Sequence, residues 1–304
     1  MKFAIISAPF DYSSRLEGAS DGPGAIVETL TRNLWEPGIA WKVFTVKSLP
    51  RKTEECDPRR KRVVEAMLAV DDYYAQVSHV MEKGYFPIYL GGEHTVAFAS
   101  AKATSFYGNT GILWIDAHGD YNNSRTSPSG NVHGMALRMI TGRSLTAYTK
   151  LERPLIREEN AVLFGTRDVD PLEKRMLKKS NVTNYSMKSI RARGLDKCIQ
   201  EWVERFRKLD GLHISLDLDA LDPKHAPGVG TPVEGGFTLT EIKTVLAAAL
   251  PLKPVCLDVV EYNPYLDREG KTAATAAELI SWFVKKLTHR RSRPRSLAYP
   301  EFLS

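Results

Sequence analysis

Short apolar runs recur along the chain, and each is apolar at consecutive rather than alternating positions. Continuous apolarity is typical of strands that are buried on both faces of a parallel sheet. The runs are also rich in β-branched and aromatic residues, which strands favour. We therefore expect eight strands, the sixth with the weakest pattern, at residues 3–7, 41–46, 86–90, 111–115, 161–164, 182–185, 212–216 and 255–260.

Stretches with a helical pattern separate these runs, at residues 24–34, 62–83, 95–106, 133–140, 172–179, 189–208, 239–250 and 273–287. Regular alternation of strands and helices predicts one parallel sheet with helices on both faces. We expect a single three-layer α/β/α domain spanning residues 1–304, without internal repeats or linkers. The Pro- and Gly-rich segment 223–236 directly follows a strand, so we interpret it as an active-site loop.

The composition is that of an ordinary globular protein, with 43% hydrophobic and 26% charged residues among 304. This is enough apolar material for a sizeable core. The formal net charge is +6. The two densest basic segments, at residues 59–62 and 285–295, contain none of the aromatic side chains that stack on single-stranded nucleic acid. We interpret both as solvated faces or a subunit contact and expect no nucleic-acid partner.

Three cysteines, Cys56, Cys198 and Cys256, lie far apart and form no CxxC pair, so we expect no disulfide framework. Cys256 lies within an apolar run and is interpreted as a small core residue. The N-terminal apolar run is too short for a secretion signal, and no apolar stretch approaches the length of a transmembrane helix. We therefore expect a cytoplasmic protein without a membrane partner.

Polar residues follow the third expected strand in the sequence Gly91-Gly92-Glu93-His94. The glycines permit a sharp turn off the strand, which places His94 at the junction with the next helix. A histidine at such a junction is more often a capping or hydrogen-bonded group than a metal ligand. Taken alone, His94 leaves both interpretations open.

The fourth expected strand is followed by Asp116-Ala117-His118-Gly119-Asp120. Residues two apart in an extended chain face the same side. Asp116, His118 and Asp120 therefore converge if the strand geometry persists to the last of them. Carboxylates are rarely buried unless they are paired or bound to a metal, so this motif favours a metal site over an ordinary acidic loop.

The seventh expected strand ends in a third acidic motif, at residues 217–223. Asp217 and Asp219 again share a face, whereas Asp222 precedes a proline and is interpreted as a turn residue.

Together the three strand ends offer two imidazoles and four carboxylates, which are more ligands than one tetrahedral ion requires. The set suits two adjacent divalent ions bridged by carboxylates, and its oxygen-rich chemistry favours Mn²⁺ over Zn²⁺. Two such ions and four carboxylates are formally neutral, so a bridging water can lose its proton near neutral pH and become a nucleophile. We expect two Mn²⁺ per chain.

These three motifs, in this order, resemble those of the ureohydrolase family, which includes arginase and agmatinase. The resemblance spans nearly the whole chain, from residues 22–25 to residues 261–264, and GGxH, DAHxD and SxDxDxxDP are highly specific as a set. It implies that one ion is bound by His94, Asp116, Asp120 and Asp217, and the other by Asp116, His118, Asp217 and Asp219. Glu93 stands where arginases usually have aspartate, and the resemblance gives it no ligand role.

The motifs on the substrate side resemble arginase more than agmatinase. The resemblance implies that Asn122 and Ser129 contact a substrate α-carboxylate, that Asp170 holds the α-amino group, that Glu261 pairs with the guanidinium, that Thr231 lines the pocket and that His133 is a proton shuttle. Taken singly, residues 129–131 also fit a simple turn, and Asp170 before Pro171 also fits a simple helix start.

The resemblance therefore implies hydrolysis of L-arginine to L-ornithine and urea by a metal-bridging hydroxide that Asp120 orients, in a homo-oligomer, either a trimer or a hexamer. The nearest alternative is a sister hydrolase acting on agmatine, guanidinobutyrate or N-hydroxyarginine. Another is a catalytically silent binding protein on the same fold, which the intact ligand motifs disfavour. A nucleic-acid binder is motivated only by the net charge.

Overall fold

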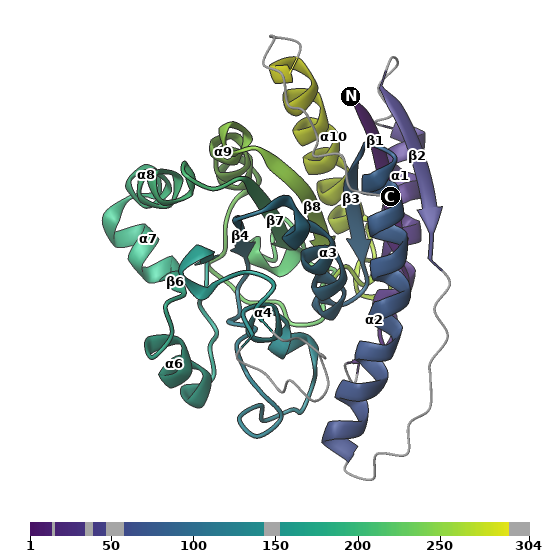
Figure 1. Ribbon diagram of the computed structural model, residues 1–304. Coiled ribbons are helices and arrows are strands. Elements are labelled where there is room, and N and C mark those ends of the chain that lie inside the picture. The colour runs from purple at the N-terminus through teal and green to yellow at the C-terminus, as the bar shows by residue number, and fades with distance from the viewer. Residues whose placement is uncertain (14–15, 34–38, 47–57, 143–152, 292–304) are drawn as a thin grey trace.

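One parallel sheet organises the molecule (Figure 1). The computed structural model describes residues 1–13, 16–33, 39–46, 58–142 and 153–291. The eight expected strands are confirmed, and their order across the sheet is β2-β1-β3-β8-β7-β4-β5-β6. Their bounds are β1 Lys2–Ala8, β2 Ala40–Thr45, β3 Tyr85–Gly91, β4 Thr110–Ile115, β5 Ala161–Phe164, β6 Thr183–Tyr185, β7 Gly211–Asp217 and β8 Pro254–Val260.

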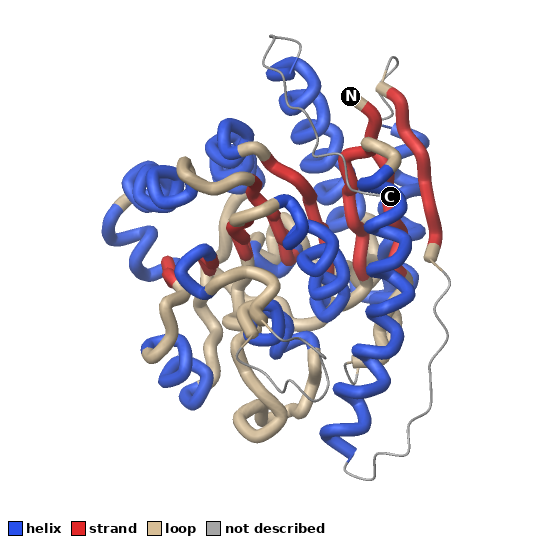
Figure 2. Tube along the Cα trace, in the orientation of Figure 1, coloured by secondary structure: helices blue, strands red, loops and turns tan. Residues whose placement is uncertain are grey.

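Helices cover both faces of this sheet (Figure 2), which confirms the expected three-layer α/β/α domain. One face packs against α1 Gly22–Asn33, α7 Met187–Arg193, α8 Leu195–Phe206, α9 Leu239–Ala249 and α10 Lys271–Arg291. The other packs against α2 Pro58–Glu82, α3 Ala97–Thr104, α4 Ala136–Ile140 and α6 Pro171–Lys178. Two hydrophobic clusters fill the space between the layers, one on each face of the sheet.

The single helix predicted at residues 189–208 is instead two helices, α7 and α8, so that prediction was wrong. The chain breaks at Gly194, whose φ of 89° lies far from helical values. Glycine adopts positive φ without the steric cost of a Cβ and commonly ends a helix. The amphipathic pattern continues across the break, which is why the pattern alone did not reveal it.

The run at residues 41–46 was predicted to be buried on both faces, and this was wrong for that strand. It forms β2, which pairs only with β1 at one edge of the sheet. Four of the six residues of β2 are exposed, and Val43 retains 42% of its accessible surface. A strand at the edge of a sheet pairs with one neighbouring strand only, so some of its side chains can remain exposed to solvent. The sequence pattern does not indicate whether a strand lies at the edge or in the centre of a sheet.

The four central strands, β3, β8, β7 and β4, are buried along nearly their whole length. All strand pairs in the sheet are parallel, so their carboxyl ends lie at one edge. Ligands bind outside this edge in folds of this class. The segments that follow these four strands therefore form the natural place for a site.

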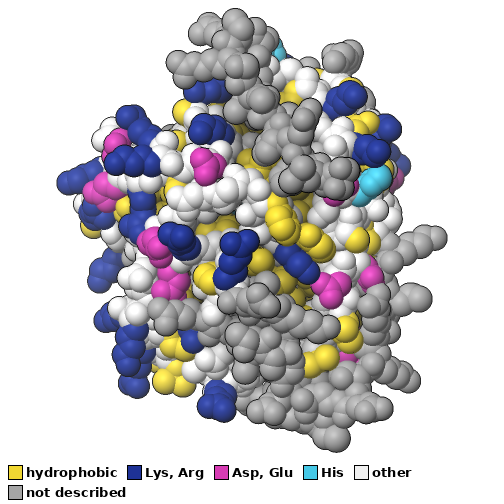
Figure 3. Space-filling model, viewed as in Figure 1, with side chains coloured by type: hydrophobic (Ala, Val, Ile, Leu, Met, Phe, Trp, Pro, Cys, Tyr) yellow, Lys and Arg dark blue, Asp and Glu magenta, His cyan; other side chains and the backbone are white. Residues whose placement is uncertain are grey.

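Charged side chains are scattered over the face shown in Figure 3, with Asp and Glu lying between Lys and Arg. The basic segment at residues 285–291 belongs to α10. Cys56, residues 292–295 and the side chains of residues 59–62 lie outside the described part of the chain. None of the described helices combines the length and the apolarity needed to cross a membrane.

Candidate metal centre and substrate pocket

The ends of the four central strands meet in one cavity of ≈ 270 Å³. His94 lies in the short helix His94–Val96 after β3, Asp116 follows β4, Asp217 is the last residue of β7, and Glu261 follows β8. His94 and Asp116 are fully buried, and the other expected site residues line the cavity: His118, Asp120, Asn122, Ser129, His133, Asp170, Asp217, Asp219, Thr231 and Glu261. The structure thus brings together every residue that the sequence singled out for this site.

Three carboxylates surround Nδ1 of His94. This nitrogen lies 3.2 Å from Oδ2 of Asp116, 3.2 Å from Oδ2 of Asp120 and 3.1 Å from Oδ2 of Asp217. It makes no well-aligned hydrogen bond to any described residue, although it is buried. The other ring nitrogen, Nε2, lies 2.9 Å from Oγ of Ser215. An imidazole that is fixed by one nitrogen and directs the other at several carboxylates has the arrangement of a metal ligand.

Asp116 joins this group to a second one. Its Oδ2 faces His94 and accepts a hydrogen bond from Nε1 of Trp114 at 2.8 Å, whereas its Oδ1 lies 3.6 Å from Nδ1 of His118. The same nitrogen of His118 is 2.9 Å from Oδ2 of Asp219. His94, Asp116 and Asp217 can therefore hold one cation, and Asp116, His118 and Asp219 can hold another.

The side chains converge, but not by the strand alternation that we predicted. β4 ends at Ile115, and Asp120 has a left-handed backbone with φ of 47°. Asp219 lies in the short helix Leu218–Ala220. Its backbone N–H donates a hydrogen bond to Oδ1 of Asp217 at 2.8 Å. Aspartate side chains commonly bind backbone N–H groups two residues on. These local turns, rather than extended chain, direct the carboxylates into the cavity.

The electrostatics of the centre are unfavourable without a cation. Burial, and then the charge of Asp116, raise the pKa of Asp120 to about 6. Burial, and then the charges of Asp219 and Asp116, raise the pKa of Asp217 well above its usual range. Buried carboxylates that repel one another are stabilised by paired or coordinated cations. The donor set and the orphaned Nδ1 of His94 therefore fit divalent metal ions.

His133 and Glu261 form a pair on the wall of the cavity. Nδ1 of His133 lies 3.0 Å from Oε1 of Glu261, which also accepts a hydrogen bond from the backbone N–H of His94 at 2.7 Å. Burial alone would lower the pKa of His133, but the charge and hydrogen bond of Glu261, together with the charges of Glu93 and Asp120, raise it to about 9. Burial alone would raise the pKa of Glu261, but the charge and hydrogen bond of His133, together with the hydrogen bond and charge of His94, outweigh burial and lower it. The pair is therefore ionised at neutral pH.

Polar groups line the outer end of the cavity. Nδ2 of Asn122 donates to Oδ2 of Asp170 at 2.9 Å, and Oδ1 of Asn122 is buried without a hydrogen-bond partner among the described residues. Asp170 also caps α6, with Pro171 at its first position. The helix-start interpretation of Asp170 is therefore correct, and it is compatible with a place in the cavity.

Ser129 and Thr231 complete this lining. Oγ of Ser129 accepts a hydrogen bond from the backbone N–H of Asn131 at 3.1 Å, so the turn interpretation of this segment is also correct. The hydroxyl of Thr231 donates to Oδ2 of Asp219 at 3.2 Å, which joins the loop 223–236 to the carboxylate group. That loop lies at the cavity, as expected for a segment at the carboxyl end of a strand.

Glu173 is part of the cavity wall, although it was not among the residues expected there. Its Oε1 accepts a hydrogen bond from the backbone N–H of Tyr121 at 2.7 Å, and burial raises its pKa to about 8. A Cβ on Gly119 would lie 2.6 Å from the carboxyl carbon of Glu173. The available signal was its position three residues after Asp170, which is that of a capping box.

Arg167 was also given no role by the sequence. Its Nη2 donates to the backbone oxygens of Asp219 at 2.6 Å, Leu221 at 3.1 Å and Val233 at 2.8 Å. The guanidinium thus ties the turn that carries Asp219 to the loop that carries Thr231. Asp222 is the expected turn residue, with its carboxylate accepting the backbone N–H groups of Lys224 and Gly235.

Known proteins share both the sequence and this fold. The arginase of Bacillus subtilis (strain 168) is 36% identical over 288 residues, which cover 93% of this chain and 97% of that protein. The solved arginase of Bacillus caldovelox superposes with a TM-score of 0.86 at 32% identity, covering 93% of this chain and 97% of its own. The agmatine ureohydrolase of Thermoplasma volcanium superposes with a TM-score of 0.74 at 25% identity, covering 96% and 92%.

The family model described as the arginase family matches residues 1–284. This match includes every residue of the cavity. With a relative that is 36% identical over nine-tenths of the chain, it shows that this protein belongs to the arginase family of metal-dependent hydrolases.

Proposed function

We propose that this protein hydrolyses L-arginine to L-ornithine and urea at a centre that holds two Mn²⁺ ions. The observation that carries the proposal is the single cavity with carboxylates and imidazoles at its floor and the Asn122–Asp170 pair at its outer end. Carboxylates and imidazoles that can hold two metal ions suit the hydrolysis of a guanidinium. A polar outer end suits a substrate that carries an ammonium and a carboxylate.

The residues that would hold the ions fall into two overlapping groups, with Asp116 and Asp217 shared. One group is His94, Asp116, Asp120 and Asp217, and the other is Asp116, His118, Asp217 and Asp219. Their oxygen-rich chemistry suits Mn²⁺. When bound there, two divalent ions would supply a water that loses its proton near neutral pH, and positive charge opposite the charge that develops during hydrolysis.

Glu261 is placed to orient the guanidinium. A carboxylate can accept two parallel hydrogen bonds from the planar fork of a guanidinium. The low pKa of Glu261, which results from its contact with His133 despite burial, keeps this side chain ionised at neutral pH. Asp120, at the floor of the same cavity, can accept a hydrogen bond from the attacking water and orient it.

His133 is suited to donate a proton to the departing amine. The leaving nitrogen must gain a proton when the C–N bond breaks, and general acids typically contribute roughly a hundred- to ten-thousand-fold to such a step. With a pKa raised to about 9, His133 carries that proton at neutral pH. Its contact with Glu261 holds the ring beside the residue that orients the guanidinium.

At the outer end, Asn122 and Ser129 would contact the α-carboxylate of the substrate, and Asp170 its α-ammonium. Oδ1 of Asn122 has no partner among the described residues, although it is buried. A buried polar atom without a partner is costly, and a ligand that supplies one is favoured. Thr231, in the loop 223–236, would contact the carbon chain of the substrate.

The test is a urea-release assay on a panel of guanidino compounds with Mn²⁺ added. We expect L-arginine to give the highest kcat/KM, ahead of agmatine, guanidinobutyrate and N-hydroxyarginine. A preference for agmatine would overturn the substrate and favour a sister ureohydrolase. We also propose, from family membership, a homo-oligomer, either a trimer or a hexamer, which light scattering can check.

A further inference from the structure

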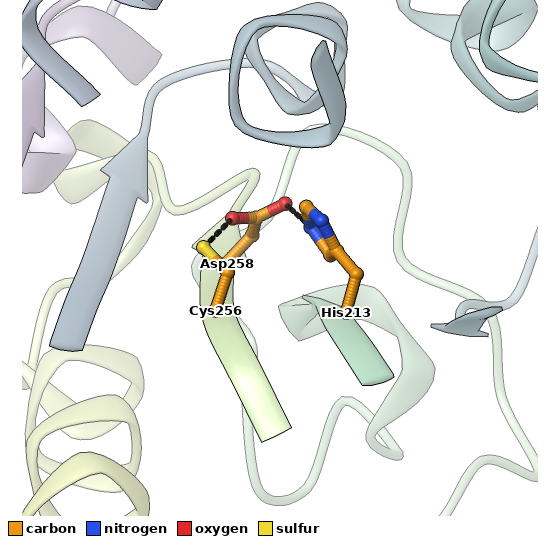
Figure 4. Close-up of side chains that lie close together, drawn as sticks. All are labelled: His213, Cys256 and Asp258. Carbon is orange, nitrogen blue, oxygen red and sulfur yellow. Dashed lines mark hydrogen bonds and ion pairs between the residues drawn. The ribbon is translucent and has the colours of Figure 1, made fainter. Parts of the chain in front are cut away.

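A second group of metal-ligating side chains lies within the sheet, below the candidate metal centre. It consists of His213 on β7 with Cys256 and Asp258 on β8 (Figure 4). Each of the three is 0% exposed. His213 and Cys256 are partners in the register of the two strands, and Asp258 is the partner of Ser215. The group therefore faces the same side of the sheet as Asp217, four residues further along β7 from His213.

The three side chains point toward one another. Nε2 of His213 lies 2.6 Å from Oδ2 of Asp258, and Sγ of Cys256 donates to Oδ1 of the same carboxylate at 3.3 Å. One nitrogen, one sulfur and one oxygen, one from each residue, all lie within 4.8 Å of one another. This spacing is compatible with three ligands around a single ion.

Among the described residues, the buried carboxylate of Asp258 has an imidazole as its one possible cationic partner. The hydroxyl of Ser100 donates to its Oδ2 at 2.9 Å, and its other partners are the imidazole and the thiol. Within the described part of the chain, it pairs with no lysine or arginine. Fully buried carboxylates are usually paired with a cation or coordinate a metal. With a neutral imidazole, the group carries one net negative charge.

Tyr89 provides an independent indication. It lies on β3 as the register partner of Asp258, and its buried hydroxyl makes no hydrogen bond to any described residue. Register partners on adjacent parallel strands direct their side chains to the same face of the sheet, so Tyr89 lies on the face that carries the group. Tyrosine hydroxyls usually find a partner when they are buried.

We propose that His213, Cys256 and Asp258 bind one Zn²⁺ ion, with the fourth position directed toward the hydroxyl of Tyr89 or a water bound to it. Zinc takes cysteine, histidine and aspartate ligands in tetrahedral sites. The oxygen-rich floor of the active-site cavity contains no sulfur ligand, so the thiolate selects a softer ion here than there. The assignment does not depend on which guanidino compound the enzyme hydrolyses.

The charges and protons balance. The ion brings two positive charges, and the thiol of Cys256 releases one proton to solvent as the Zn–S bond forms. The net charge of the group thereby changes from −1 to zero. The proton on Nε2 of His213 moves to Nδ1, which lies 2.9 Å from the hydroxyl of Thr104, and this hydroxyl can accept it in a hydrogen bond. Ser100 keeps its hydrogen bond to the carboxylate.

The experiment uses the full-length protein purified from cells grown with zinc and then treated with a chelator that strips the open centre at the cavity. We expect about one chelator-resistant zinc per chain by elemental analysis, since the site is buried and closed. In Cys256→Ser this zinc should be lost. Cys198→Ser is the matched control, because Cys198 is also a buried free cysteine but lies on α8.

Growth with Co²⁺ in place of zinc gives a second readout that does not involve activity. Wild-type protein should show a thiolate-to-cobalt charge-transfer band, because only a cysteine ligand can produce one. The band should persist in a Cys56→Ser, Cys198→Ser double variant, in which Cys256 is the last cysteine, so the test survives if Cys256→Ser fails to fold. Wild-type protein without resistant zinc, or a band absent from the double variant, would overturn the assignment.

Discussion

Nδ1 of His133 lies 3.0 Å from Oε1 of Glu261, and this contact links two segments that are 128 residues apart in the chain. Glu261 has a left-handed backbone with φ of 67°, and its N–H donates to the backbone oxygen of Gly92 at 2.7 Å. The carboxylate is therefore held between the imidazole of His133 and the N–H of His94. In the proposed function, substrate recognition and proton supply would therefore meet at this one side chain.

Replacement of His133 by alanine should slow turnover while leaving metal content unchanged. The imidazole lies outside both candidate ligand groups, and loss of a general acid typically costs roughly a hundred- to ten-thousand-fold. The measurement is kcat for L-arginine beside elemental analysis of the same sample. His79→Ala, on the exposed surface of α2, is the matched control. Turnover that survives without His133 would exclude the proton-shuttle role.

The metal-free protein should lose stability as the pH rises from 6.5 to 9. A histidine whose pKa is raised in the folded state stabilises the fold fully below its unfolded pKa, and this is lost as pH rises through about 9 for His133. The loss from this residue alone is roughly 3 kcal/mol. Asp120 acts in the same direction at lower pH, because its raised pKa of about 6 favours its protonated form.

Denaturant unfolding with a chelator present, at both pH values, checks this pH dependence. Glu261→Gln provides the control, because it removes the charge that raises the pKa of His133. The difference between the two pH values should shrink in that variant. A wild-type protein that is equally stable at pH 6.5 and pH 9 would contradict the ion-pair assignment.

Asp116→Ala and Asp217→Ala should each abolish binding of both ions, whereas Asp219→Ala should mainly affect one. Asp116 faces both imidazoles, and removing a shared ligand disturbs two coordination shells at once. Elemental analysis after Mn²⁺ loading should fall from about two ions per chain to near zero. Asp71→Ala, at an exposed pair with Lys102, should change nothing. Full metal content in Asp116→Ala would refute the shared site.

Asp170→Ala should reduce kcat/KM for L-arginine roughly a hundredfold while metal content stays normal, because hydrogen bonds between charged groups are lost. Agmatine, which lacks the carboxylate, should already be a poor substrate for the wild type for a related reason: Asn122 and Ser129 are left unpaired. Asp196→Ala, at an exposed position on α8 outside the cavity, is the control. Equal use of arginine and agmatine by the wild type would remove the case for an outer polar subsite.

Arg167→Met should destabilise the protein by roughly 2–4 kcal/mol, because several backbone oxygens lose a charged donor. It should also weaken metal retention, since the turn that carries Asp219 loses its tie to the neighbouring loop. Arg175→Met, at an exposed position on α6, is the control for removal of a charge. Unfolding curves with and without Mn²⁺ separate the two effects, and an unchanged metal affinity would limit Arg167 to a purely structural role.

The strands could be predicted because each is a short, largely apolar run rich in the β-branched and aromatic residues that strands favour. The order of the strands in the sheet could not be predicted, because an apolar run does not indicate which other strand it pairs with. β8 is the last strand along the chain, yet it lies between β3 and β7, and this places Glu261 beside His94. The same limit explains the wrong expectation for β2, whose position at the edge follows from the sheet order alone.

For the site, residue types at strand ends identified the candidates, but the reason given for their convergence was wrong. Asp120 reaches the centre through a backbone with φ of 47°, which no alternation pattern predicts. Glu173 and Arg167 act on backbone groups that are distant in sequence, so only the folded structure reveals them. His213 lies within the apolar run that predicts β7. Its contact with Asp258 could not be predicted, because the run does not indicate which strand lies beside it.

The sheet order also has a consequence for biosynthesis. The proposed ligands extend from His94 to Asp219, but the strand that separates β3 from β7 is β8, which ends at Val260. During synthesis, the chain lacks β8 until about residue 260 has been made. Without β8, nothing sets the distance between His94, which follows β3, and Asp217 at the end of β7. Retention of metal by the proposed ligands must then await the folding of β8, and a truncated chain ending before β8 would present histidines and aspartates without the geometry to retain an ion.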